Sequence, residues 1–124
     1  MTGSGDVGHD LARAIAAKDA DALRALLAPD VDFTAITPRR HWDANDRDEV
    51  VSIVLGRWFE DKDRIDSVEQ VESDAFADRR RVGYRFAVTN PDGRFLVEQQ
   101  AYLEVEDGQS GWMRLVCSGF RPVD

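Results

Sequence analysis

The sequence predicts an α+β domain in which a curved antiparallel sheet wraps around helices from the N-terminal half of the chain. Two patterns carry this prediction. Apolar residues recur at helical spacing before residue 60, and they alternate with polar residues, as in β-strands, after Asp66. The third observation is a pair of glycine-containing turn sequences between the later strands. With 124 residues, the chain has the length of one domain with its own core.

Two short helices are expected near the N-terminus. Residues 1–9 are small and polar, so we expect a flexible lead-in there and a single domain over residues 10–124. The polar stretch 18–21 interrupts the helical pattern, and Asp19 is placed to cap the second helix. Pro29 is expected to end that helix. The apolar positions with helical spacing are Leu11, Ile15, Leu23, Leu26 and Leu27.

A short strand and a better-marked helix are expected next. Residues 31–35 alternate between apolar and polar, which predicts a strand. Asp46 and Glu49 have the spacing of a capping box, with Asp in the Ser/Thr role, so a helix should begin there. A glycine costs a helix about 1 kcal/mol relative to alanine, so Gly56 predicts a close packing neighbour. The apolar stripe of this helix contains Val50, Val51, Val54, Leu55 and Trp58.

The second half of the chain is expected to be a meander of strands. Residues 67–76 form the weakest of them, because the alternation slips between Val68 and Val71, as at a β-bulge. Turns at residues 90–93 and 107–108 separate the next three strands. The inner face of these strands is expected to carry Val82, Tyr84, Phe86, Val88, Val97, Gln99, Ala101, Leu103, Val105, Met113, Leu115 and Cys117.

Composition excludes several classes of function. The 16 Lys and Arg residues against 24 Asp and Glu residues give a net charge of −8, which argues against binding to nucleic acid or to an anionic membrane surface. One cysteine cannot form an intrachain disulfide, and we see neither a signal peptide nor an apolar stretch of about 20 residues. We therefore expect a cytoplasmic protein that meets neither nucleic acid nor a membrane.

At this point the chain resembles the nuclear transport factor 2-like, or SnoaL-like, superfamily. The residues that carry the likeness are 14–23, with the sequence AIAAKDADAL, and 26–33, with the sequence LLAPDVDF, followed by the capped helix and the long strands. The resemblance implies a conical pocket between the sheet and the helices. Its members include ketosteroid isomerase, scytalone dehydratase, limonene epoxide hydrolase and polyketide cyclases, beside many proteins without enzymatic activity.

The resemblance implies chemistry that this chain only partly matches. The positions of the isomerase base and of its oxyanion-hole acid fall near Ala35 and Ala101, which cannot move a proton. A dehydratase of the scytalone type needs two pocket histidines, and the epoxide hydrolase type needs an acid–arginine–acid relay on the strands. A cyclase needs an aspartate paired with a histidine, which only His41 and Asp43 offer. If the protein is an enzyme, the resemblance implies an isomerase, dehydratase or cyclase that uses no cofactor.

Three residues are candidates for acid–base catalysis. His41 and Asp43 precede the capped helix, at the expected mouth of the cone, where an imidazole and a carboxylate can act as acid and base. Tyr84 can donate to a ligand carbonyl or to a developing oxyanion. The alternatives are an Asx-turn role for Asp43 and a core role for Tyr84 with a backbone partner.

The most informative polar residue is Gln99, which interrupts an apolar face. A buried amide without partners costs about 1–3 kcal/mol, so a ligand, a water molecule or Tyr84 should satisfy it. Cys117 is either a small buried hydrophobe or a nucleophile activated by His41. No spacing of ligands predicts a metal site. The residues expected to line a ligand pocket are Trp42, Trp58, Tyr84, Phe86, Gln99, Leu103, Met113 and Cys117.

The opposite face of the sheet predicts a homodimer, because helices on one side only would leave its apolar residues exposed. The residues expected at this interface are Tyr102, Trp112, Val116 and Phe120. The sequence therefore predicts that the cone binds a small apolar molecule, which could be cyclic. Two alternatives stay open: an acid–base enzyme, and a dimeric interaction domain whose cone is filled by its own side chains. Neither the ligand nor the pathway follows from the sequence.

Overall fold

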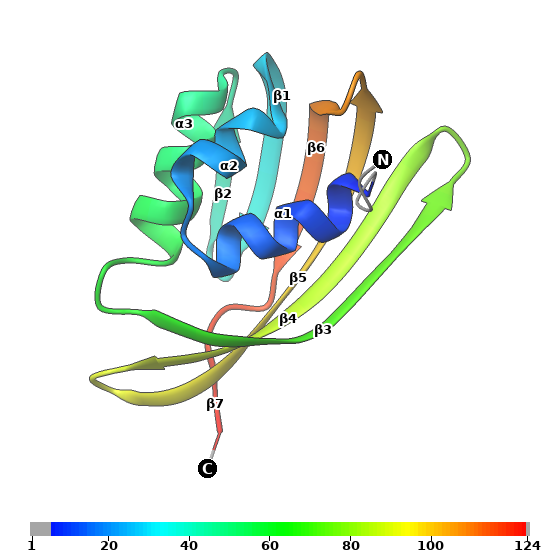
Figure 1. The fold of residues 1–124 in the computed structure, drawn as a ribbon. Coiled ribbons are helices and arrows are strands. Elements are labelled where there is room, and N and C mark those ends of the chain that lie inside the picture. Colours follow the sequence, from blue (N-terminus) through cyan, green and yellow to red (C-terminus); the bar gives the residue numbers. More distant parts are fainter. Residues whose placement is uncertain (1–5, 124) are drawn as a thin grey trace.

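The computed structural model describes residues 6–123 and is an α+β domain with helices on one side of a bent sheet (Figure 1). The strands lie in the order β2-β1-β6-β5-β4-β3, and the short strand β7 pairs with β5. The elements are α1 (Val7–Ala16), α2 (Ala20–Ala25), β1 (Leu27–Thr37), β2 (Arg40–Ala44), α3 (Arg47–Ser52), the π-helix η1 (Ile53–Trp58), β3 (Arg64–Phe76), β4 (Arg79–Asn90), β5 (Gly93–Glu106), β6 (Gln109–Cys117) and β7 (Arg121–Pro122).

Helix α1 begins earlier than the sequence led us to expect. Asp6 accepts hydrogen bonds from the backbone amides of Gly8 and His9, at 2.9 and 3.3 Å, and thereby caps the helix. The prediction of a flexible lead-in over residues 1–9 is therefore wrong for residues 6–9, while residues 1–5 lie outside the described part of the chain. The small and polar residues of this segment favoured a flexible chain, but Asp6 is a residue type that commonly caps a helix.

Helix α2 is capped as predicted but does not end as predicted. The side chain of Asp19 accepts from the backbone amide of Ala22 at 3.0 Å. The helix ends at Ala25, and Pro29 lies within β1, where the pairing between β1 and β6 is interrupted between Leu27 and Asp32. Since Pro29 lacks a backbone N–H, its place in this unpaired stretch leaves no donor unsatisfied.

The helix predicted from Asp46 is present and changes character halfway. Asp46 accepts from the backbone amide of Glu49 at 2.8 Å, as the capping spacing predicted. The α-helical turns of α3 then give way to the π-helix η1, and Trp58 at its end and Phe59 directly after it are buried. The neighbour expected at Gly56 is absent, because a Cβ atom there would meet nothing within 4 Å among the described residues.

The sheet confirms the predicted meander and adds one connection that the sequence did not predict. Strands β3 to β6 are joined by antiparallel hairpins, and β3 has a register shift between Val68 and Gln70, inside the predicted bulge. Strand β1, however, pairs in parallel with β6, the last long strand of the chain. This pairing places the hairpin β1–β2 beside β6, a strand from the C-terminal part of the chain (Figure 1).

The inner face of the sheet and the helices form one apolar core, with the register that the alternation predicted. Val82, Tyr84, Phe86 and Val88 of β4 are at most 1% exposed. Their partners across β5 include Gln99, which is equally buried. The outer face carries the residues in between, which are charged or polar at most positions.

Candidate functional site

The predicted inner-face tyrosine and glutamine form a buried hydrogen-bonded pair. Tyr84 on β4 and Gln99 on β5 are register partners, and each is 1% exposed. The Tyr84 hydroxyl donates to Gln99 Oε1 at 2.6 Å. Tyr84 is therefore one of the partners expected for Gln99, and its hydroxyl satisfies the amide oxygen.

The donor half of that amide has no partner. Gln99 Nε2 is buried without an acceptor, and within residues 6–123 only one other buried side-chain nitrogen or oxygen shares this state, the indole Nε1 of Trp58. Both atoms are N–H donors, and both residues belong to the same apolar core. A buried donor without an acceptor costs about 1–3 kcal/mol, so each position favours an added acceptor atom.

Tyr84 acts at this position as a hydrogen-bond donor. Burial raises the pKa of its hydroxyl far above the usual value, with a smaller contribution from the Cys117 thiol, so the phenol stays protonated. Of the described ionisable side chains, Asp63 is the buried carboxyl group. Its two oxygens accept from the Glu60 backbone amide and from Asn90 Nδ2, at 3.0 and 2.9 Å, so it serves the loop before β3.

The predicted catalytic group is not assembled. His41 and Asp43 lie on strand β2 with side chains 62% exposed, and His41 Nδ1 is 3.6 Å from Asp43 Oδ2. Along the sheet, His41 is paired with Ile36, which is paired with Val116; both of these are exposed on the outer face. Tyr84 points to the inner face, so the sheet separates it from the imidazole. Residues 40–44 form strand β2, and the alternation of side chains along it places His41 and Asp43 on the outer face.

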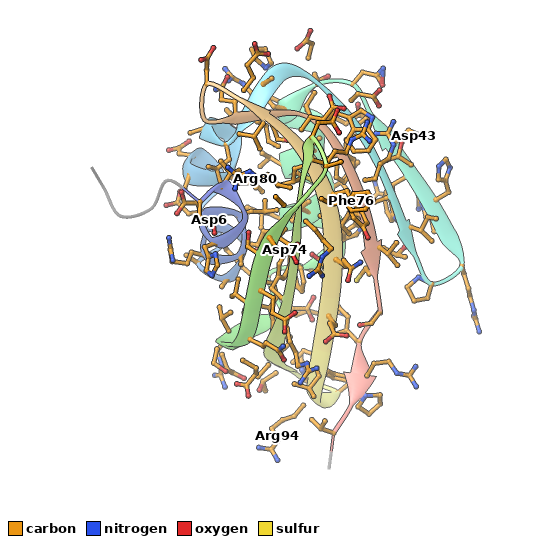
Figure 2. The ribbon with its side chains drawn as sticks, turned by 90° about the vertical axis from the view of Figure 1, so that its right-hand side faces the viewer. Asp6, Asp43, Asp74, Phe76, Arg80 and Arg94 are labelled. Carbon is orange, nitrogen blue, oxygen red and sulfur yellow. The ribbon has the colours of Figure 1, made fainter. Side chains whose placement is uncertain are left out.

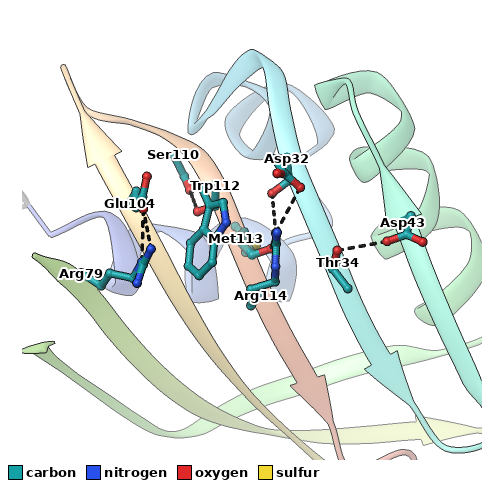
Figure 3. A network of polar contacts seen from close by, with 9 residues as sticks. All are labelled: Asp32, Thr34, Asp43, Arg79, Glu104, Ser110, Trp112, Met113 and Arg114. Atoms are coloured by element: carbon teal, nitrogen blue, oxygen red, sulfur yellow. Dashed lines mark hydrogen bonds and ion pairs between the residues drawn. The ribbon is translucent and has the colours of Figure 1, made fainter.

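Asp43 has a structural partner on the outer face instead. The hydroxyl of Thr34 on β1 donates to Asp43 Oδ1 at 3.0 Å, across the β1–β2 ladder (Figure 3). Figure 2 shows Asp43 at the β2 edge of the sheet. Among the described residues no backbone amide donates to Asp43, so it does not form the Asx turn considered for it, and Asp46 caps the helix.

The residues predicted to line a pocket pack against one another. Phe86, Leu103 and Met113 are fully or almost fully buried, and Trp42 and Cys117 are half-buried at the margin of the core. Of the eight predicted residues, only Tyr84 and Gln99 border any of the three hollows that the structure describes, and the other six line none of them. The expected open apolar chamber is therefore not among them, because aromatic side chains of the helices and strands occupy the interior.

One hollow lies on the outer face of the sheet and has a volume of about 430 Å³. Gly83 forms part of its floor, and side chains of alternating charge, among them Arg81, Arg85 and Glu98, form its walls. Tyr84 and Gln99 also border it, but their side chains are buried on the other side. A second hollow of about 580 Å³ is lined mainly by carboxylates, and a third of about 380 Å³ lies beside Gly56.

A cluster of arginine and tryptophan that the sequence analysis missed lies where β2 meets η1. We call Arg40, Trp42, Arg57 and Trp58 the rim cluster. The Arg40 and Arg57 guanidinium carbons lie 3.8 and 5.4 Å from the centroid of the Trp42 ring. The Trp58 ring meets the Trp42 ring edge-on at 6.1 Å. The sequence places Arg40 and Trp42 on one strand face, but only tertiary structure brings Arg57 to them.

The rim cluster and Gln99 lie at the same end of the cone. Gln99 is paired with Cys117, whose sulfur accepts from the Gly119 backbone amide at 3.4 Å. A Cβ atom on Gly119 would lie 2.6 Å from Cγ of Pro38, so this segment packs tightly against the turn that precedes Arg40. This end of the cone is therefore formed by the β1–β2 turn, the end of η1 and the segment after β6.

The outer face carries most of the predicted interface residues. Val116 is 57% exposed there, and Trp112 lies between the guanidinium groups of Arg79 and Arg114, at 4.1 and 4.5 Å from its ring centroid (Figure 3). Phe120 is an exception to the prediction. It follows the end of β6 and packs against Phe59 and Phe95 at centroid distances of 6.0 and 5.7 Å, toward the core.

No group of three or more His, Cys, Asp and Glu side chains within residues 6–123 could hold a metal ion. Over the same residues, no helix has the length and apolar character needed to cross a bilayer.

Known proteins resemble this chain in their folded structure. No protein-family model matches the sequence, and no functionally curated protein does either. A candidate isomerase from Rhodopseudomonas palustris has a similar structure, with a TM-score of 0.74 at 13% identity over 94% of this chain and 92% of that one. A candidate polyketide cyclase from Xanthomonas campestris gives 0.68 at 19% identity, over 89% and 86%.

A third similar structure is an LEH-like epoxide hydrolase of M. tuberculosis, with a TM-score of 0.64 at 13% identity over 90% of this chain and 80% of that one. Identities this low establish the fold and leave the chemistry to the residues of each chain. The curved sheet, the helices on its inner side and these likenesses agree. The chain has the cone-shaped α+β fold of the nuclear transport factor 2-like proteins that its sequence resembles.

Proposed function

We propose that the protein binds a small apolar molecule inside the cone and that the molecule offers a hydrogen-bond acceptor to Gln99. The observation that carries this proposal is the buried Gln99 Nε2, which has no acceptor among the described residues. Tyr84 holds the other end of the amide at 2.6 Å and so fixes the direction of the free donor. A carbonyl or ether oxygen on the ligand would complete the pair.

The apolar surroundings define the rest of the ligand. Gln99 lies among Ala101, Leu103 and Val97 on its own strand, all fully buried. Burying apolar surface contributes about 25 cal/mol per Å², so a hydrocarbon body suits this site better than a polar one. Trp58 supplies a second unpartnered N–H in the same core. Ketones, esters and lactones of modest size have this combination of groups.

Binding without turnover fits the residues better than catalysis does. Acid–base chemistry needs a group that gives up or takes a proton near neutral pH. Tyr84 is held protonated, because burial raises the pKa of its hydroxyl, and His41 and Asp43 face solvent on the other side of the sheet. Several similar structures have enzyme names, and those names describe the proteins that carry them. Because this chain shares only their fold, the names support an enzymatic role for it only as far as the fold does.

A ligand must displace side chains to enter. Trp58 and Phe59 fill the core at the end of η1, and Phe59 contacts Phe86 and Phe120 at centroid distances of 5.8 and 6.0 Å. The π-helix that positions them is a rare conformation that is frequently found at functional sites. We infer that the end of η1 shifts to admit the ligand.

The test compares two glutamines on opposite faces of β5. We expect 2-acetonaphthone, an apolar ketone, to bind the wild-type protein in isothermal titration calorimetry. Gln99→Leu should weaken binding about tenfold or more, since the ketone loses its donor. Gln100→Leu, one residue along on the outer face, should leave the affinity unchanged. If Gln100→Leu weakens binding and Gln99→Leu does not, the ketone occupies the outer hollow and the proposal is wrong.

A second candidate function is supported by the outer face. We propose that two copies of the chain associate through a patch that contains Ile36 and Val116, neighbours across β1 and β6 that are 53% and 57% exposed. Around the patch, positive and negative side chains alternate, as in the Arg85–Glu98 pair, so a second copy related by two-fold symmetry can pair unlike charges. A dimer with a filled core would need no ligand.

A further inference from the structure

We propose that Arg40 and Arg57 form an anion-binding entrance to the cone, so that the ligand is a small apolar acid with its oxyanion at the rim cluster. This inference rests on the proposed function and specifies its ligand further. It follows from the charges and contacts of the rim cluster, which are independent of the Gln99 amide.

The two arginines are among those that no carboxylate of this acidic chain neutralises within residues 6–123, and they are set apart because both lie on the ring of Trp42. Arg79, Arg81, Arg85 and Arg114 each lie within 3.2 Å of a carboxylate oxygen. Arg40 and Arg57 have no carboxylate partner among residues 6–123, although the chain carries 24 acidic side chains. Two guanidinium groups gathered on one ring without a counter-ion repel each other, and a bound anion would remove that repulsion.

Stacking on Trp42 leaves the arginines able to bind. In a cation–π contact the face of the guanidinium lies against the ring, while the N–H groups at its edge remain free to donate. Trp42 is itself held in place, because its Nε1 donates to the hydroxyl of Thr37 at 2.8 Å. The planar arrangement of donors matches a carboxylate or phosphate, which guanidinium groups bind with two parallel hydrogen bonds.

A buried donor in the same cluster points to the same ligand. Trp58 packs edge-on against Trp42 and at a tilt against Phe33, each at a centroid distance of 6.1 Å. Its Nε1 has no acceptor among the described residues, although the residue is only 8% exposed. An oxyanion at the rim would accept from the arginine edges, and its second oxygen or an adjoining group would accept from this indole. The apolar part of the ligand would then extend toward Gln99.

The experiment uses three probes with the same ring system. Isothermal titration calorimetry compares 2-naphthoate, 2-naphthyl phosphate and the uncharged 2-acetonaphthone on the wild-type protein. We expect at least one of the anions to bind about tenfold more tightly than the ketone, as hydrogen bonds to charged groups imply. The anion that does so identifies the head group as a carboxylate or a phosphate. The preference should decrease as salt is added.

Matched variants separate specific binding from overall charge. Arg57→Gln and Arg40→Gln should each remove the preference for the anion while leaving ketone binding intact. Arg39→Gln makes the same charge change on the exposed neighbouring residue, which stacks on no ring, and should have no effect. Equal affinity for anions and ketone, or an equal loss in Arg39→Gln, overturns this inference and leaves the proposed function standing. If none of the probes binds, both proposals are wrong.

Discussion

The hydroxyl of Tyr84 gives Gln99 one of the hydrogen bonds that a buried amide needs. That Gln99 requires a partner was predictable, because a polar side chain interrupts an otherwise apolar alternation on its strand. Which partner it has, and that the Nε2 donor remains without one, depends on side-chain geometry that a sequence does not contain. The unsatisfied donor is the reason for assigning a ligand to this position.

The free energy of unfolding at alkaline pH should show whether the Tyr84 hydroxyl is buried. Its folded-state pKa lies above the unfolded-state value of about 10. Below pH 10 its contribution to the free energy of unfolding is therefore constant, and above pH 10 it falls by about 1.4 kcal/mol per pH unit. Urea unfolding of wild type and Tyr84→Phe at pH 8 and pH 11 should show the larger decrease in the wild type. Equal decreases in both proteins would mean that Tyr84 is not buried.

His41 and Asp43 show where residue-level prediction fails. The sequence places an imidazole and a carboxylate two positions apart, and the structure brings them to 3.6 Å. Proximity alone does not form a site, because both belong to the solvent-facing side of an edge strand. No strand is predicted from the sequence over residues 40–44. The alternation of side chains along that strand is what assigns both residues to the outer face.

At the level of elements, local signals predicted most of the structure. The caps at Asp19 and Asp46, the bulge in β3 and the faces of β4 to β6 follow from rules that involve only a few neighbouring residues. The π-helix η1 and the parallel pairing of β1 with β6 do not. Both depend on contacts between distant segments, and the rim cluster likewise joins residues of β2 to residues of η1.

Two helix glycines should respond in opposite ways to the same substitution. A Cβ atom on Gly8 would lie 2.9 Å from Cβ of Val82, whereas one on Gly56 would meet nothing within 4 Å among residues 6–123. Gly8→Ala should therefore destabilise the protein by about 1–3 kcal/mol through overpacking. Gly56→Ala should stabilise it by up to about 1 kcal/mol through helix propensity. Urea unfolding measures both, and the reverse order would contradict the packing of α1 on β4.

At the level of the whole molecule, the fold was predictable and the interior was not. Element order and alternation define a cone, and similar structures confirm it. Whether the cone is hollow depends on how side chains such as Trp58 and Phe59 fill it, and close packing is a property of volumes in three dimensions. The same fold therefore remains compatible with binding and with a purely structural role.

Association through the outer face should be sensitive to one substitution. Val116→Asp places a charge in the centre of the exposed apolar patch and should weaken a dimer at least tenfold. Val123→Asp makes the same change at a residue that is 39% exposed near the C-terminus and should have no effect. Sedimentation velocity over a range of concentrations measures both variants. A wild-type protein that stays monomeric throughout would exclude the proposed dimer.

Gln99 itself offers the most direct measurement of ligand binding inside the cone. In a nitrogen-15-labelled sample, the side-chain amide of Gln99 can be assigned by comparison with the Gln99→Leu variant and followed by NMR during titration with 2-acetonaphthone. Our account predicts that its two proton signals move with the ketone concentration, while those of Gln100 stay fixed. Saturating ketone that leaves the Gln99 signals in place would show that the orphaned donor is no binding site.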